Sequence, residues 1–253
     1  RVGGTGDVTE FGLIVDDFKL YSSDSGSEVE VFSDDFESYT VGNSLDPDAA
    51  TAGTAPIVDA VPEPGTPYRS DSFDVFVVDT GAPASDLSAR IADRSDLDAG
   101  ELRYKASNAI VTGRMTATVL REAGAKAEDP NEDAQIAIYG SSTSTANAMT
   151  YITLDISGDD FDLRAAGSSS GGGSTAGFVE DQEFDIEIAW DASGATDTIA
   201  PLVTVTIDGQ VAFSGADFAS PSADLTTVAT GVETIQLRIG GTADVTEFVL
   251  IFG

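Results

Sequence analysis

Three carboxylates alternate with apolar residues along one short stretch, Glu183-Phe184-Asp185-Ile186-Glu187. Because successive side chains of a β-strand point to opposite faces, Glu183, Asp185 and Glu187 are expected to share one face. Two carboxyl groups that flank one bond are what a retaining glycosidase needs, one as nucleophile and one as general acid. The same alternation also fits a simpler interpretation, in which the apolar residues face the core and the acids face water. We favour the second interpretation and expect no catalytic residue and no enzyme.

The charge balance excludes several other functions. Asp and Glu number 44 against 12 Lys and Arg, which gives a formal net charge of −32. Such a field repels phosphate backbones and anionic membrane surfaces, so we expect no nucleic-acid partner. The chain contains no His and no Cys, which excludes Ser-His-Asp and Cys-His catalysis, thiolate-bound zinc and disulfides.

The location of the protein is predicted from the same features. No apolar run approaches the roughly 18–20 residues that span a bilayer, so we expect no membrane insertion. The sequence starts at Arg1 with no signal peptide in front of it. We therefore expect a mature, exported protein that works outside the cell or at its surface.

Two-residue alternation recurs along the whole chain, whereas helical periodicity is almost absent. Gly, Ser, Asp and Pro clusters separate the alternating stretches, as turns do between short strands. The pattern predicts an all-β fold, namely a two-sheet antiparallel jelly-roll sandwich with an N-terminal strand extension. We expect the extension and its linker at residues 1–28 and the sandwich at residues 29–253. The predicted strands are 11–21, 73–78, 87–92, 102–106, 110–120, 135–139, 150–156, 161–164, 184–190, 203–207, 211–213, 234–239 and 246–252.

One internal repeat links the two ends of the sequence. Residues 1–16 are RVGGTGDVTEFGLIVD and residues 238–253 are RIGGTADVTEFVLIFG, identical at 11 of 16 positions. The first copy continues as a strand through Tyr21, and the second copy ends at Gly253. We therefore expect the body of the module to lack its closing strand and residues 9–21 to carry a strand of that type.

Two stretches carry a resemblance to a known family. Residues 32–42, FSDDFESYTVG, resemble the opening of concanavalin A-like and laminin-G-like jelly-roll modules of exported bacterial proteins, and residues 14–20, IVDDFKL, resemble their closing strand. The resemblance implies two antiparallel sheets. It also implies that the strand ending in Trp190, which comes just before the Asp208-Gly209 hairpin, is not a catalytic one. Members include sugar-binding modules, glycan-cleaving enzymes and structural domains, so the fold does not decide the function.

The resemblance also implies a structural calcium ion, because related jelly rolls often use one to join the opening segment to the closing strand. The implied ligands are Asp34, Asp35 and Glu37 together with Asp16 and Asp17. Calcium takes six to eight oxygen ligands, which carboxylates and turn carbonyls can supply.

These features favour a structural subunit of an extracellular filament or tandem-repeat fibre. A sandwich that lacks a strand exposes a sheet edge, and a neighbour's N-terminal strand can fill the gap. Such head-to-tail contacts between copies do not close on themselves. The inward parity switches around Asp16-Asp17, which predicts a bulge there. The predicted interface residues are Phe11, Leu13, Val15, Phe18, Leu20, Phe248 and Leu250.

Three alternatives stay open at this point. Residues 9–21 can instead fold back into their own module. The protein can also be a carbohydrate-binding or adhesin module for a neutral polysaccharide, with exposed tyrosines as a stacking platform. A glycan-degrading enzyme is the third possibility. The tyrosines concerned are Tyr39, Tyr68, Tyr104, Tyr139 and Tyr151.

Overall fold

A computed structural model describes the architecture. It covers residues 12–41, 57–58, 75–80, 86–92, 100–121, 134–140, 148–154, 160–164, 173–176, 182–215 and 230–239. Every element among these residues is a β-strand, and no helix there is long and apolar enough to cross a membrane. The predicted strand at 246–252 lies outside the described residues. The strands are β1 (Gly12–Ser22), β2 (Val29–Asp34), β3 (Ile57–Val58), β4 (Val75–Asp79), β5 (Leu87–Ala92), β6 (Gly100–Ile110), β7 (Thr112–Arg121), β8 (Ala134–Tyr139), β9 (Ala148–Leu154), β10 (Asp160–Arg164), β11 (Gly173–Ala176), β12 (Glu183–Asp191), β13 (Leu202–Ile207), β14 (Gln210–Gly215) and β15 (Val232–Ile239).

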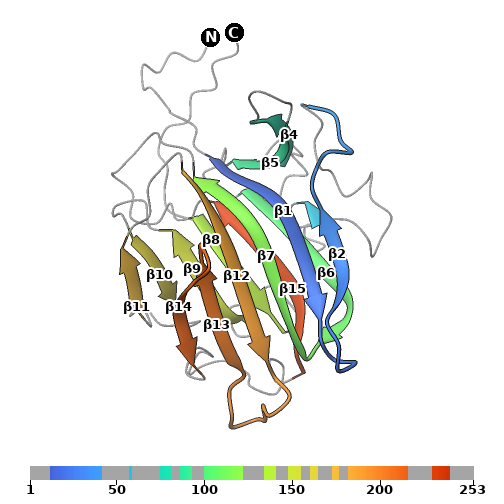
Figure 1. The fold of residues 1–253 in the computed structure, drawn as a ribbon, viewed down its shortest axis with the longest axis vertical. Helices are drawn as coiled ribbons and strands as arrows, with labels where there is room; N and C mark the ends of the chain where they lie inside the picture. Colours follow the sequence, from blue (N-terminus) through green and yellow to red (C-terminus); the bar gives the residue numbers. More distant parts are fainter. Residues whose placement is uncertain are drawn as a thin grey trace, which may run out of the picture.

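The strands form two antiparallel sheets that pack as a sandwich (Figure 1). Sheet A has the order β14-β13-β12-β7-β1-β5-β4, and β2 pairs with the second half of β1. Sheet B has the order β11-β10-β9-β8-β15-β6-β3. The predicted all-β class and the two-sheet antiparallel sandwich are therefore confirmed.

The core lies between the two sheets and follows from the alternation in the sequence. In β12, Phe184, Ile186, Ile188 and Trp190 are all buried, while Glu183 and Asp185 are exposed on the opposite face. Their counterparts from sheet B are Ile136, Ile138, Ile235 and Leu237, in the same apolar cluster. The second interpretation of the acidic stretch, with its apolar residues in the core, therefore holds.

The β13–β14 hairpin turns at Asp208 and Gly209, both of which have a left-handed backbone, with φ of 48° and 73°. Two-residue hairpins of this handedness match the twist of the strands they join, which is why Asp-Gly is a strong hairpin signal. The Asp208 carboxylate also accepts a hydrogen bond of 2.9 Å from the Asp185 N–H, so the turn is tied to β12.

From residue 12 on, the segment that the sequence assigned to an N-terminal extension is one of the strands of the sandwich. Residues 12–22, assigned from the sequence to an extension, form β1 near the middle of sheet A of the same chain. The structure thus has the folded-back arrangement, in which the module is completed by its own first strand.

Candidate functional site

The position of β1 is the candidate functional site, and we call it the β1 slot. The first half of β1, residues 12–15, pairs with β5 on one side and β7 on the other. The second half pairs with β2 and β7. Leu20 of β1 lies opposite Phe32 of β2. The stretch that resembles a closing strand and the stretch that resembles an opening strand are therefore neighbours in sheet A.

The apolar side chains of β1 fill the slot from within. Leu13, Val15, Phe18 and Leu20 are each at most 2% exposed. These are four of the predicted interface residues, and the structure places all four in the core. Phe11, Phe248 and Leu250, the other three, lie outside the described residues.

A bulge separates the two halves of β1. The register between β1 and β7 shifts between Asp16 and Lys19, and Asp17 has a left-handed φ of 46°. Asp tolerates this conformation better than most residues, because its short polar side chain adds little steric conflict. The shift lets Val15 and Phe18 both point inward although they are three residues apart. The bulge predicted from the parity switch at Asp16-Asp17 is therefore confirmed.

Aromatic packing joins the second half of the slot to sheet B. The ring centroids of Phe18 and Phe32 lie 5.7 Å apart, and those of Phe18 and Tyr104 lie 6.1 Å apart. Phe32 stacks on Tyr104 with centroids separated by 4.2 Å. Tyr104 belongs to β6, so this cluster connects the β1–β2 hairpin to the other layer of the sandwich.

The turn from β1 to β2, residues 23–28, is held by the neighbouring β6–β7 hairpin. The Asp24 carboxylate accepts backbone hydrogen bonds from Val111 at 3.1 Å and Thr112 at 2.7 Å. The Ser23 N–H in turn donates to the carbonyl of Thr112 at 2.8 Å. Gly26 takes a left-handed φ of 84°, which a glycine adopts without a steric penalty.

A second group of contacts holds the same turn, and we call it the Arg114 clamp. Its members are Arg114 of β7, Glu28, Glu187 of β12 and Tyr21 of β1. Arg114 donates two hydrogen bonds of 2.9 Å to the Glu28 carboxylate and one of 2.8 Å to Glu187. Its guanidinium lies 4.1 Å from the centre of the Tyr21 ring. The hydrogen bond from Arg114 holds the pKa of Glu28 below its ordinary value.

Sequence reasoning missed the clamp, because Glu28 and Glu187 lie 86 and 73 residues away from Arg114. The one available signal was a lone arginine on the polar face of a strand otherwise rich in threonine. A cation there needs a counter-charge, but nothing local identifies which acid supplies it.

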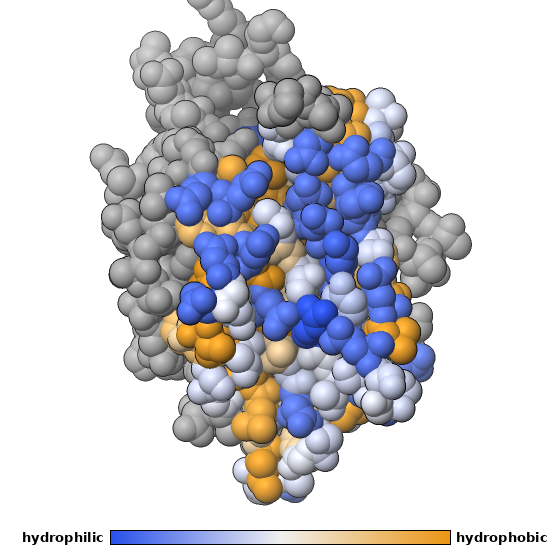
Figure 2. Space-filling model, in the orientation of Figure 1, coloured by the Kyte–Doolittle hydropathy of each residue, from blue (hydrophilic) through white to orange (hydrophobic). Residues whose placement is uncertain are grey.

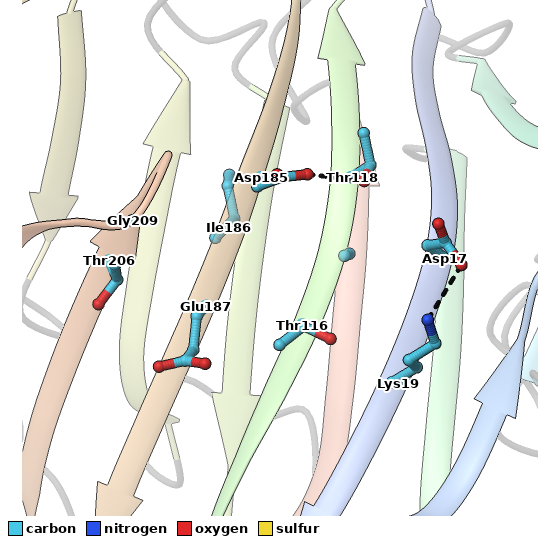
Figure 3. Close-up of a pocket in the computed structure, with 10 residues that line it drawn as sticks. Asp17, Lys19, Thr116, Thr118, Asp185, Ile186, Glu187, Thr206 and Gly209 are labelled. Atoms are coloured by element: carbon cyan, nitrogen blue, oxygen red, sulfur yellow. Dashed lines mark hydrogen bonds and ion pairs between the residues drawn. The ribbon is translucent and has the colours of Figure 1, made fainter.

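The outer face of sheet A is hydrophilic over β1, β7 and β12 (Figure 2). A hollow of about 450 Å³ lies on this face. Its polar lining includes Lys19, Thr116, Thr118, Asp185 and Glu187 (Figure 3). The hollow offers hydroxyl, carboxylate and ammonium groups to a ligand, in a shallow surface open to water.

The acids of β12 are engaged in contacts within the sheet. Asp185 accepts a 2.9 Å hydrogen bond from the Thr118 hydroxyl, and Glu187 is ion-paired with Arg114 at 2.8 Å. Glu183 is exposed. These contacts give Asp185 and Glu187 structural partners.

The acids of the opening segment, predicted to bind calcium, also have partners within the protein. Asp34 accepts hydrogen bonds from the Phe36 N–H and the Tyr39 hydroxyl, both at 2.9 Å. Asp35 and Glu37 each accept one backbone hydrogen bond, at 3.2 and 2.6 Å. Burial is the main cause that raises the pKa of Asp34 above its ordinary value.

The remaining predicted calcium ligands lie at the bulge. Burial is the main cause that raises the pKa of Asp16 to about 6. The hydrogen bond from the Asp17 N–H acts in the lowering direction, and the negative charges of Asp86, Asp17 and Glu37 act in the raising direction. Asp17 is ion-paired with Lys19 at 3.1 Å. Across the described ranges, no three or more acidic side chains are arranged to hold a metal ion. These residues do not form a ready-made calcium centre, and structural calcium stays a prediction.

The tyrosines considered as a sugar platform are not gathered on an exposed face. Tyr104 and Tyr139 are buried, at 6% and 3% exposure, and Tyr39 packs partly buried against the core. Nothing is described of the Tyr151 side chain, and Tyr68 lies outside the described residues. The three described rings therefore serve packing.

Comparisons with family models, curated proteins and solved structures give no match to this chain. The β1 slot, the contacts that hold it and the hollow lined in part by β1 are therefore the features that bear on function.

Proposed function

We propose that this chain is a structural subunit of an extracellular filament or tandem-repeat fibre. Subunits join head to tail when the N-terminal strand of one copy enters the β1 slot of the next. The observation that carries the proposal is the place of β1, which is an inner strand of sheet A and connects to β2 through the turn at residues 23–28. The subunit has no catalytic role in this proposal, and it works outside the cell or at its surface.

The energetics of the slot support strand exchange. Burial of Leu13, Val15, Phe18 and Leu20 contributes roughly 1.5–3 kcal/mol each, or about 6–12 kcal/mol together. An empty slot is therefore strongly unfavourable. A strand from another copy restores the same contacts, so exchange changes the covalent connection and leaves the packing unchanged. The turn at residues 23–28 must then extend into a linker.

The charge of the chain sets a condition on assembly. Copies that each carry a net charge of −32 repel one another, so filaments should form only where cations screen that repulsion. Calcium is one such cation, and we propose it as a stabiliser. Removal of calcium with a chelator should lower the melting temperature or dissociate the filaments, and indifference to the chelator would remove calcium from the proposal.

A disulfide lock tests the donation of β1. Ile14 of β1 lies directly opposite Leu120 of β7, and the chain has no cysteine of its own. Directly opposite residues of antiparallel strands have Cα atoms about 4.5–5.5 Å apart, within the roughly 4.4–6.8 Å that a disulfide spans. The double variant Ile14→Cys/Leu120→Cys, refolded and oxidised at high dilution, keeps β1 in its own slot.

The measurement is negative-stain electron microscopy of the locked chain and of the same chain after reduction. We expect filaments only after reduction. Filaments of the oxidised chain, with the intramolecular bond verified by mass spectrometry, would rule out donation of β1. Discrete particles of about 26 kDa under both conditions would also rule it out.

The hollow on sheet A supports a second candidate function, the binding of a neutral polysaccharide. Hydroxyl and carboxylate groups such as those of Thr116, Thr118 and Asp185 hydrogen-bond sugar hydroxyls. Titration of neutral oligosaccharides against the wild type and the Thr118→Val variant tests this function. We expect saturable binding that the variant weakens, and no binding to any of them would dismiss the candidate.

A further inference from the structure

The repeat at the two ends of the sequence covers only one half of the β1 slot. Residues 246–253 match residues 9–16, and the identical positions include Leu250 for Leu13 and Ile251 for Ile14. In the structure, residues 12–15 are the part of β1 that pairs with β5 and β7. The repeat stretch therefore corresponds to the first half of β1, on the N-terminal side of the bulge.

Residues 249–252 have the pattern of side chains that the first half of the slot requires. It needs apolar side chains at two alternating inward positions, where Leu13 and Val15 are 0% exposed. The corresponding residues are Leu250 and Phe252, so the inward parity is the same. Val249 takes the place of Gly12 and adds a β-branched residue, which favours a strand. The one demanding change is Phe252, which is larger than Val15.

The two halves of β1 are held very differently. The second half belongs to the β1–β2 hairpin, whose turn is fixed through Asp24 and the Arg114 clamp. Residues 12–15 come before the bulge and share in none of those contacts. Departure of the first half would therefore leave these contacts intact, together with the pairing of residues 19–22 with β2 and β7.

We propose that residues 249–252 of a second copy of this chain pair between β5 and β7, in place of residues 12–15. The first half of the slot is then a docking site for the C-terminal segment of a neighbouring subunit. This inference shares with the proposed function the idea that the slot accepts a strand from another copy. It names a different donor, and it leaves the β1–β2 hairpin intact.

Cysteine pairing between two chains tests the inference. One full-length chain carries Ile251→Cys, another carries Leu120→Cys, and the two are mixed and oxidised. Because Ile251 corresponds to Ile14, which lies opposite Leu120, we expect a disulfide-linked heterodimer. A matched control carries Leu250→Cys, whose side chain would point to the other face of the sheet. We expect about tenfold more heterodimer with Ile251→Cys than with Leu250→Cys.

Equal yields from the two cysteine positions, or no heterodimer, would overturn the inference. It would also be overturned if a chain carrying both Ile251→Cys and Leu120→Cys formed only the intramolecular bond. A fluorescent peptide of residues 243–253 gives a second readout without cysteine in the slot. It should bind the wild type and lose binding to the oxidised Ile14→Cys/Leu120→Cys lock.

The result separates this inference from the proposed donation of β1. A mixture of Ile14→Cys and Leu120→Cys chains reports the N-terminal donor, and the mixture with Ile251→Cys reports the C-terminal donor. Linkage through Ile251 alone would support the docking site and refute donation of β1. Linkage through Ile14 alone would do the reverse. The Phe252→Val variant, which restores the size of Val15, should increase linkage through Ile251.

Discussion

At the scale of single residues, Asp17 determines how β1 fits its slot. Its left-handed backbone lets the strand change parity, so that apolar side chains on both sides of the bulge reach the core. A residue that resists this conformation at position 17 would disturb the packing of the whole second half of β1. The backbone conformation of Asp17 is thus more important for the fold than its carboxylate, which forms an exposed ion pair with Lys19.

Substitutions at Asp17 should separate these two contributions. Asp17→Val places a β-branched residue in a left-handed conformation and should destabilise the fold by about 1–3 kcal/mol. Asp17→Asn removes the charge but tolerates the same φ, so its effect should stay within about 0.5 kcal/mol. Urea denaturation measures both. Equal losses in the two variants would show that the ion pair, and not the backbone, matters here.

Asp16 should make stability depend on pH. Its pKa is raised to about 6 in the folded protein, chiefly by burial, from an ordinary value of 3.8. The folded state therefore binds a proton more readily than the unfolded state between about pH 4 and pH 6. The stability contributed by this group falls as pH rises through that window.

The Asp16→Asn variant should consequently be more stable than the wild type at pH 7, by about 1 kcal/mol once solvent screening is allowed for. The gain should vanish near pH 4. Thermal denaturation of both chains across this range is the measurement, with Asp197→Asn on an exposed turn as the control. A gain that is the same at every pH would contradict the assignment to Asp16.

At this scale, a feature could be predicted from the sequence only where the residues that form it are close together in the chain. The bulge was predictable, because the spacing of Val15 and Phe18 is visible within a few residues. The Arg114 clamp was not predictable, because its acids come from distant parts of the chain. The acids of the opening segment are a similar case, since composition cannot show that Asp34, Asp35 and Glu37 each accept a backbone hydrogen bond.

At the scale of elements, the β1–β2 hairpin keeps the first strand paired within its own chain. The Arg114 clamp lies at its turn and joins it to β7 and β12. Bidentate Arg–carboxylate pairs are the stronger kind of ion pair, and stacking on the Tyr21 ring restricts the guanidinium further. The clamp should therefore control how often the hairpin opens.

Loss of the clamp should loosen β1. In Arg114→Ala, Glu28 and Glu187 lose their shared cation, and the partly exposed pairs contribute about 1 kcal/mol. Hydrogen exchange of the amides in the second half of β1 should accelerate about fivefold. Arg114→Lys keeps the charge without the bidentate geometry and should give an intermediate rate. Unchanged exchange in Arg114→Ala would show that other contacts hold the hairpin.

The sequence predicted strands correctly where apolar and polar residues alternate over several positions. It did not predict short strands that are defined by their hydrogen bonds to a neighbouring strand. The predicted stretch at 87–92 coincides with β5, and the stretch at 184–190 lies within β12. β3 has two residues and β11 lies in a Gly/Ser run that favours a loop. These two become strands through their pairing with β6 and β10, which no local pattern reports.

At the scale of the whole molecule, the net charge of −32 opposes compaction as well as assembly. The Debye length falls from about 30 Å at 0.01 M salt to about 3 Å at 1 M. Repulsion that extends across the sandwich at low salt is thus confined to nearest neighbours at high salt. The fold and the filament should respond to ionic strength in the same direction.

The melting temperature should rise by about 5–10 °C between 0.01 M and 1 M sodium chloride. Calorimetry at pH 7 measures the shift, and the same titration near pH 4 is the control. Many carboxylates are neutral there, so the salt effect should shrink. A melting temperature that does not respond to salt at pH 7 would show that self-repulsion is unimportant for this chain.

The central position of β1 also has a consequence for the newly made chain. Its partner β7 ends at Arg121, 99 residues after the end of β1 at Ser22. At about 5–20 residues per second, translation takes roughly 5–20 s to supply that partner. Of the three strands that pair with β1 in the described part of the chain, β2 and β5 are the ones made before β7. Chains growing side by side on one message thus have time to capture one another's strands before either sandwich closes.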